Sequence, residues 1–162
     1  NETFVLCACV FVLAVYFQSS NSSELNEQEL RKIGISIRND FNTCFSEIGI
    51  TPADFVKPME IVTNVHLQPA NEERTNKHGC FIACVLKKQN LIEGTKIKEE
   101  QVYERLQLIF DENPGGPMHQ IVQKCMEKVR NDAQECEKCF SVYVCTIKDM
   151  YEEEQRRKNE RN

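Results

Sequence analysis

Cysteine is the residue type with the clearest chemical potential in this sequence, which contains nine cysteines among its 162 residues. Thiols can pair as disulfides, bind zinc or act as nucleophiles. On a helix, Cys80 and Cys84 lie one turn apart on one face, so the two thiols point at different neighbours. Cys136 and Cys145 are about half a turn out of phase and would join opposite sides of one helix to different neighbours. Six cysteines still allow fifteen pairings, so the spacing alone leaves the pairing open.

The N-terminal segment bears on the redox state of these thiols. Phe4–Phe17 contains no charged residue and is shorter than the roughly 18 residues that a membrane-spanning helix needs, which is typical of the apolar region of a signal peptide. Small residues follow and favour cleavage after Ser22. The chain does not begin with Met and has Glu2 where a positive charge is usual. We therefore interpret residues 1–22 as an N-terminally incomplete or atypical signal peptide, with a membrane anchor as the alternative.

A secreted, extracellular chain is expected to oxidise its cysteines into a disulfide framework. Removal of the signal peptide would leave an odd number, so one thiol would remain without a partner. A zinc site with four thiolate ligands, Cys125, Cys136, Cys139 and Cys145, is the alternative to disulfides. The cysteines that would remain are Cys44, Cys80, Cys84, Cys125, Cys136, Cys139 and Cys145.

Enzymatic chemistry is not indicated by the motifs in this sequence. It contains no Gly-x-Ser-x-Gly, no glycine-rich phosphate loop and no His-Glu-x-x-His. His78 and Cys80 suggest a histidine-activated thiol, but neighbours in sequence are rarely aligned in space. The net charge of −5 argues against a nucleic-acid partner. We predict a protein that is not an enzyme, needs no cofactor or metal, and has no membrane span in its body.

The elements that must position the cysteines are predicted to be helices of one domain, residues 23–151. The apolar run Cys80–Leu86, followed by Lys87 and Lys88, favours a central buried helix. Asn113–Pro117 is a clear break between two later helices. The segment 152–162 is predicted to be a charged tail of frayed helix or disorder. Six helices are predicted. Four span about 23–44, 72–88, 98–111 and 118–130. A short one begins at 51 and stops soon after Pro58, and the last begins at about 133.

Residues on the predicted faces of these helices follow the usual spacing of amphipathic helices. Ile33, Ile37, Phe41 and Cys44 form an apolar stripe on the first helix. On the fourth helix, 98–111, Arg105 is placed on the outer face with the glutamates. Residues 59–76 are predicted to be the least regular part of the chain, a loop or one short turn of helix that leads into the central helix from about Glu72.

The Cys-x3-Cys and Cys-x8-Cys spacings in a secreted six-helix pattern resemble the insect odorant-binding proteins of the pheromone-binding type. The resemblance covers about Glu24–Tyr151, and Arg31–Gly34 and Asn76–Cys80 make it most similar to ant pheromone-binding proteins. It implies an all-α, six-helix, disulfide-stapled fold around an apolar cavity. It also implies the bridges Cys44–Cys84, Cys80–Cys136 and Cys125–Cys145. Cys139 would then be buried and free, compete for Cys80, or form an intermolecular bridge.

The resemblance implies a secreted soluble carrier of small hydrophobic ligands such as odorants or pheromones, with an olfactory receptor as a further partner. Tyr143 is the candidate polar contact, unless its hydroxyl reaches the surface. The resemblance also allows a histidine switch that releases ligand at acid pH, but His66, His78 and His119 are interpreted as surface residues. The alternative function is a secreted interaction protein without a ligand cavity, including a homodimer. The predicted ligand-contacting residues are Phe55, Met59, Phe81, Val85, Leu106, Phe110, Met118, Val122, Phe140, Tyr143, Val144 and Ile147.

Overall fold

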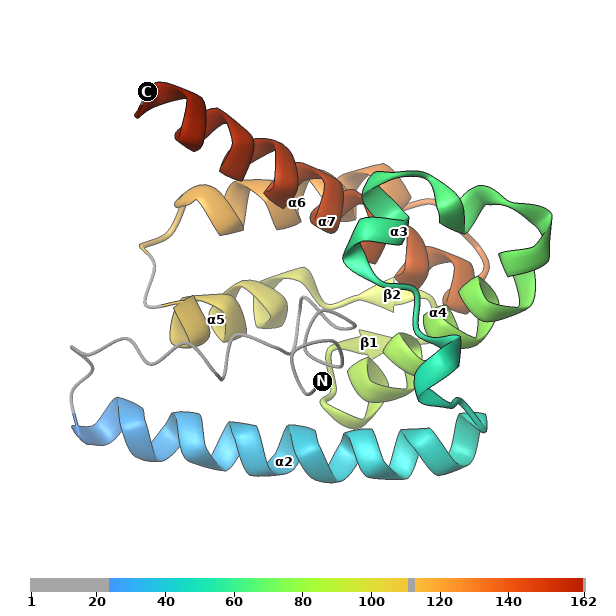
Figure 1. The fold of residues 1–162 in the computed structure, drawn as a ribbon. Helices are drawn as coiled ribbons and strands as arrows, with labels where there is room; N and C mark the ends of the chain where they lie inside the picture. The colour runs from blue at the N-terminus through green and yellow to red at the C-terminus, as the bar shows by residue number, and fades with distance from the viewer. Residues whose placement is uncertain (1–23, 111–112, 162) are drawn as a thin grey trace.

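The computed structural model describes residues 24–110 and 113–161, and this part of the chain is built almost entirely from helices (Figure 1). The predicted signal peptide lies outside the described residues. Within them, six α-helices confirm the predicted all-α, disulfide-stapled class. The helices are α2 (Glu24–Ile48), α3 (Pro58–Val62), α4 (Glu72–Lys88), α5 (Glu99–Phe110), α6 (Pro117–Val129) and α7 (Glu135–Glu160), with 3-10 turns at Pro52–Asp54, Val65–Leu67 and Pro69–Asn71.

Helix α4 is the centre of the fold. It packs most extensively against α7 and also against α2, and α6 packs on the opposite flank of α7. Every residue from Phe81 to Leu86 is buried. A helix that is apolar around its whole circumference is stable only when other elements cover it on several sides. The apolar run in the sequence therefore marks the element around which the others assemble.

Helix α2 buries the predicted apolar stripe. Ile37, Phe41 and Cys44 are buried against α4, while Ile33 is half-buried near the start of the stripe. The helix continues one turn beyond the predicted end and stops before Gly49, whose φ of +69° suits a residue without a Cβ.

The prediction that Pro58 stops a helix is wrong, because Pro58 begins one. Thr51 precedes only a single 3-10 turn, in which its backbone N–H donates to Asp54 Oδ2 at 2.8 Å. That bond lowers the pKa of Asp54 below its ordinary value. A separate helix α3 then starts at Pro58, and the Lys57 N–H donates to Glu60 Oε2 at 2.8 Å. Proline fits the first helical position because the N–H it lacks would have had no partner there.

Two further elements differ from the prediction. A short antiparallel hairpin, β1 (Ile92–Glu93) and β2 (Lys96–Ile97), turns at Gly94 with φ +59°. Strands of two residues are too short to produce a periodic signal in the sequence. The charged tail is not a separate segment, since α7 continues as one helix to Glu160. Arg156 and Arg157 hydrogen bond to Glu153 on this helix and lower its pKa to about 2.

None of the helices within the described residues combines the length and the apolar character that crossing a membrane requires.

Candidate ligand-binding site

Three disulfides set the frame of the site, and they are the bridges that the resemblance implied. Cys44–Cys84 joins α2 to α4 with a Cα–Cα distance of 5.9 Å. Cys80–Cys136 joins α4 to the start of α7 at 4.3 Å, and Cys125–Cys145 joins α6 to α7 at 5.6 Å. The two cysteines of α4 therefore diverge to different helices. Four helices are cross-linked into one unit, and their spacing does not depend on apolar packing alone.

Gly79 allows the closest of these crossings. A Cβ built on Gly79 would lie 2.1 Å from the carbonyl oxygen of Cys136 and 3.0 Å from Phe140 Cβ. Such distances are far inside van der Waals contact, so any side chain here would push α7 away from α4. The glycine therefore determines how near the backbone of α7 comes to that of α4, next to the Cys80–Cys136 bridge.

Cys139 is free and buried, with 1% of its surface exposed. Burial raises the pKa of its thiol to about 12. Cys80 is bonded to Cys136, so Cys139 does not replace Cys136 as its partner. A buried thiol is also unsuited to bridge a second chain. The zinc alternative is wrong for this arrangement, because Cys125, Cys136 and Cys145 are all held in disulfides.

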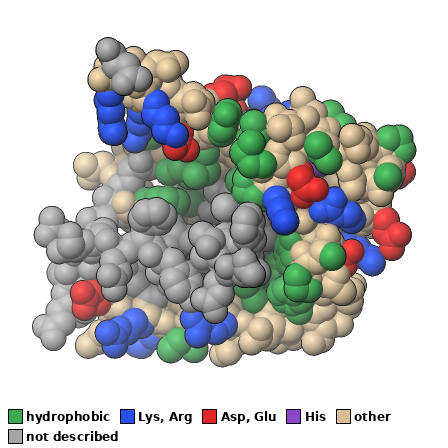
Figure 2. Space-filling view, in the orientation of Figure 1, with side chains coloured by type: hydrophobic (Ala, Val, Ile, Leu, Met, Phe, Trp, Pro, Cys, Tyr) green, Lys and Arg blue, Asp and Glu red, His purple; other side chains and the backbone are tan. Residues whose placement is uncertain are grey.

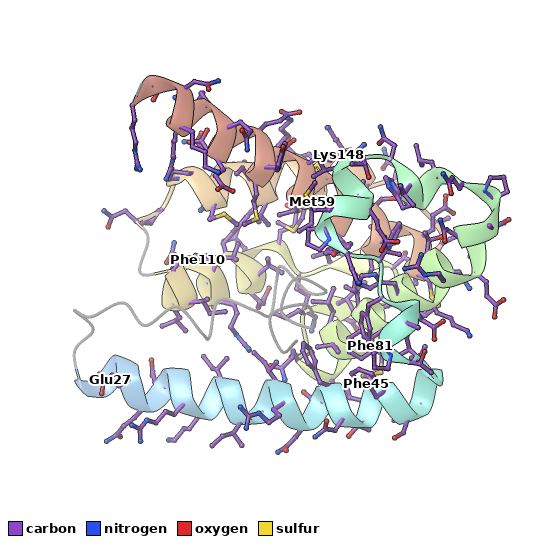
Figure 3. The ribbon with its side chains drawn as sticks, viewed as in Figure 1. Glu27, Phe45, Met59, Phe81, Phe110 and Lys148 are labelled. Carbon is purple, nitrogen blue, oxygen red and sulfur yellow. A yellow bond between two sulfur atoms is a disulfide. The ribbon has the colours of Figure 1, made fainter. Side chains whose placement is uncertain are left out.

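A continuous set of aromatic rings fills the region between α2, α4 and α7. Phe81 contacts Phe45 and Phe55, with ring centroids 5.2 and 5.1 Å apart. Figure 3 shows Phe45 and Phe81 together where α2 and α4 meet, far from Phe110 at the end of α5. The set continues through His78, whose ring lies 5.2 Å from Phe55 and 4.6 Å from Tyr143. These rings contact each other, and so this end of the molecule is packed with its own side chains.

Tyr143 and His78 hold the backbone of Val56 between them. The Tyr143 hydroxyl donates to the Val56 carbonyl at 2.9 Å, and the Val56 N–H donates to His78 Nδ1 at 3.1 Å. His78 Nδ1 must be unprotonated to accept that bond. Tyr143 is 2% exposed, so the alternative that its hydroxyl reaches the surface is wrong. Its hydroxyl proton is donated to the backbone, so the hydroxyl is not a free donor for a ligand.

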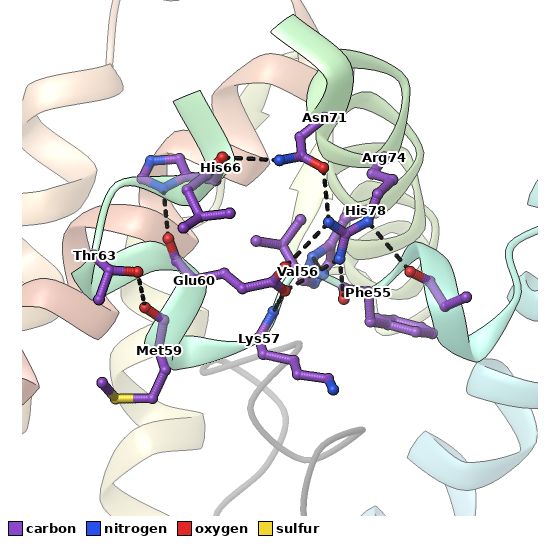
Figure 4. Close-up of polar contacts among 12 residues, drawn as sticks. Phe55, Val56, Lys57, Met59, Glu60, Thr63, His66, Asn71, Arg74 and His78 are labelled. Carbon is purple, nitrogen blue, oxygen red and sulfur yellow. Dashed lines mark hydrogen bonds and ion pairs between the residues drawn. The ribbon is translucent and has the colours of Figure 1, made fainter. Parts of the chain in front are cut away.

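Arg74 is a hub that sequence reasoning missed. Its guanidinium donates to both oxygens of Glu60 at 3.2 and 3.1 Å and to Asn71 Oδ1 at 2.8 Å. It also donates to the carbonyls of Phe55 at 3.1 Å and Ala53 at 3.2 Å, so all five N–H groups are used (Figure 4). One side chain thus fastens the segment from Ala53 to Asn71 onto α4. A single arginine in a helix carries no signal that would distinguish it from a solvated one.

The three histidines are not surface residues, so that interpretation is wrong. His78 is fully buried and His66 is 6% exposed, with His66 Nδ1 3.2 Å from the Glu60 carbonyl oxygen. His119 is half-buried, and its ring stacks on Tyr103 with centroids 4.2 Å apart. Imidazole has enough apolar surface to be buried when its nitrogens find partners, which a count of histidines does not reveal.

The predicted ligand-contacting residues fall into three groups by exposure. Met59 is 58% exposed and points away from the Arg74 hub (Figure 4). Phe110, Met118, Phe140 and Val144 are half-buried. The half-buried group and Met59 are the members whose surface remains available to another molecule. The remaining members are buried in the core: Phe55, Phe81, Val85, Leu106, Val122, Tyr143 and Ile147.

A groove of about 260 Å³ lies where the start of α6 meets the second half of α7. Met118, Ile121 and Met150 form its apolar part, and Glu153 and Arg157 contribute charged groups at its rim. Figure 2 shows hydrophobic side chains exposed on this face between α3, α5 and the paired α6 and α7. Ile121 and Met150 were not among the predicted residues, although Ile121 follows the helical spacing of Met118.

Comparisons with known proteins give consistent matches over most of the chain. The model of the PBP/GOBP family matches residues 26–149, a range that contains all six bridged cysteines. The chain is 27% identical over 146 residues to the pheromone-binding protein Gp-9 of Solenopsis electra and to that of Solenopsis pusillignis. It is 26% identical to the protein of the same name from Solenopsis interrupta. Each alignment covers 90% of this chain and 91% of the relative. No solved structure gives a significant match.

Proposed function

Because the chain belongs to the PBP/GOBP family, we propose that it is a secreted carrier that binds small hydrophobic molecules, such as odorants or pheromones, in an apolar pocket. The relatives named as pheromone-binding proteins support this role. The disulfides fit an oxidising, extracellular compartment. An olfactory receptor that takes over the ligand would be the further partner.

The observation that carries this proposal is the set of apolar side chains left half-buried on the inner faces of three helices. Phe110 on α5, Met118 and Ile121 on α6, and Met150 on α7 keep accessible surface although the core beneath them is complete. Small-molecule sites are concave and mostly apolar. Methionine and phenylalanine line such sites without requiring hydrogen bonds.

A cavity between helices needs restraints on the spacing of those helices, and the disulfides supply such restraints. Apolar helix faces tend to close on each other, and the bridges limit that closure because they hold α4 to α2 and α7, and α6 to α7. Each bridge contributes roughly 3–4 kcal/mol in the chain-entropy model. The protein can therefore keep some of its apolar surface uncovered and remain folded.

Binding of a fluorescent apolar probe, and its displacement by volatile or lipid-like compounds, tests the proposal. We expect the probe to bind with a dissociation constant on the order of micromolar. Ile121→Glu should weaken binding by about tenfold or more, because a carboxylate in an apolar site must give up its hydration. Gln123→Glu adds the same charge to the exposed face of α6 and should bind as the wild type does. A wild-type protein that binds no probe, or two variants with equal affinities, would contradict the proposal.

A further inference from the structure

Arg105 on α5 is a half-buried cation with few hydrogen-bond partners among the described residues. The prediction that it lies on the outer, solvated face is wrong. Its NH1 group donates to Gln89 Oε1 at 2.8 Å, and among the described residues no carboxylate forms an ion pair with it. Burial lowers the pKa of this guanidinium below its ordinary value, and no neighbouring charge contributes to the shift.

The contrast with the other partly buried arginine is informative. Arg74 uses all five of its N–H groups and is paired with Glu60. A guanidinium has the same five donors in every protein. Arg105 has a neutral amide oxygen as its acceptor within the described residues. In water its other donors are hydrated, so a ligand oxygen can replace that water.

Arg105 lies between the buried Val102 and Ile109, which are one turn before and one turn after it on the same face of α5. Gln89, which follows α4, donates through Nε2 to Ser36 Oγ at 3.1 Å and also to Asp40 Oδ2. On α2, Ser36 is exposed and Asp40 is half-buried, and they lie one turn from Ile33 and Ile37 respectively. The carboxylate of Asp40 is thus engaged by an amide. The guanidinium stands at one end of a polar chain that runs from α5 through Gln89 to α2.

We propose that Arg105 anchors the head group of the ligand and that the preferred ligand is a long-chain carboxylic acid. The carboxylate would accept two parallel hydrogen bonds from the guanidinium, the geometry that arginine and carboxylate share. The apolar chain of the ligand would lie along the half-buried side chains of α2 and α5, Ile33 and Phe110. This inference rests on the proposed carrier function and specifies its ligand class.

Displacement of the fluorescent apolar probe at neutral pH by three compounds of equal chain length tests the inference: dodecanoic acid, its methyl ester and dodecanol. Wild-type protein should bind the acid about tenfold or more tightly than the ester, as expected for a charge-assisted hydrogen bond. Arg105→Gln should lose that preference and leave ester binding unchanged. Arg105→Lys should retain part of it, because lysine keeps the charge without the planar fork. Arg31→Gln, on the exposed face of α2, should behave as the wild type.

The outcomes separate the inference from the function on which it rests. Equal affinities of wild-type protein for acid and ester, or an equal loss of both in Arg105→Gln, would overturn the head-group role and leave the carrier function standing. Absence of probe binding and of displacement by all three compounds would overturn the carrier function itself. Thermal unfolding checks that the variants fold. If Arg105→Gln does not fold, the inference is tested by comparing the preference for acid over ester in the wild type with that in Arg105→Lys.

Discussion

The hydroxyl of Tyr143 donates a hydrogen bond of 2.9 Å to the carbonyl of Val56, although the two residues lie 87 positions apart in the chain. This bond joins the first half of α7 to the segment just before α3. The same peptide segment is held from the other side, because the Val56 N–H donates to His78 of α4. Two helices thus fix one stretch of irregular backbone inside the core.

Tyr143→Phe is expected to lower the free energy of unfolding by about 1–3 kcal/mol, because the Val56 carbonyl would be left buried without that donor. Chemical denaturation monitored by circular dichroism measures the change. Tyr151→Phe removes the hydroxyl of a tyrosine that is 38% exposed and should change stability by less than about 0.5 kcal/mol. Equal stabilities of the two variants would show that the buried bond contributes nothing.

Gly79→Ala is expected to destabilise the protein by at least about 1–3 kcal/mol, since the added methyl group would overlap the Cys136 carbonyl. It should also slow or reduce formation of the adjacent Cys80–Cys136 bridge during oxidative refolding. Disulfide mapping by mass spectrometry and thermal unfolding provide the measurements. Asn76→Ala, at an exposed position of the same helix, is the control and should refold normally. An alanine variant that forms all three bridges with wild-type stability would refute the close-packing argument.

Cys139 is expected to resist alkylation in the native protein at neutral pH. A pKa of about 12 leaves almost no thiolate, and the thiolate is the reactive species. Treatment with iodoacetamide should modify this residue only after denaturation, which peptide mass spectrometry can follow. Cys139→Ala removes the labelling site and should retain the three disulfides. Rapid modification of the folded wild-type chain at this residue would show that the thiol is accessible.

Glu60 is expected to make stability depend on pH. Its hydrogen bonds to Arg74 lower its pKa in the folded protein, so the contribution is present above the ordinary carboxyl value of about 4.3 and is lost as pH falls through the lower folded-state value. Both side chains keep about a quarter of their surface exposed, which screens the pair, so we expect a contribution of about 1 kcal/mol.

Urea unfolding of the wild type and of Glu60→Gln, at neutral pH and near pH ~3, measures the contribution of Glu60 to the free energy of unfolding. The difference in free energy of unfolding should be larger at neutral pH and shrink in acid. Glu72→Gln, an exposed glutamate in the first turn of α4, controls for the loss of one charge. A difference between wild type and Glu60→Gln that stays constant with pH would rule out the proposed linkage.

Those features whose causes are local could be predicted from the sequence. The helical spacing of Ile37, Phe41 and Cys44 predicted the buried face of α2, and the apolar run of α4 predicted its central position. The cysteine spacing, through the resemblance it carries, implied the partners of Cys80 and Cys84 on α7 and α2, and the structure confirms both bridges. The break before Pro117 follows from backbone preferences of proline and glycine alone.

Only the tertiary structure decided which polar groups meet. Arg74 reaches Glu60, Tyr143 reaches Val56 and Arg105 reaches Gln89 across separations that no helical period relates. Such partners depend on how helices pack, and packing is a property of the whole chain, whereas periodicity repeats within a few residues. The sequence by itself therefore determined most of the helices, whereas the packed structure determined which polar groups pair, such as Arg74 with Glu60 and Arg105 with Gln89.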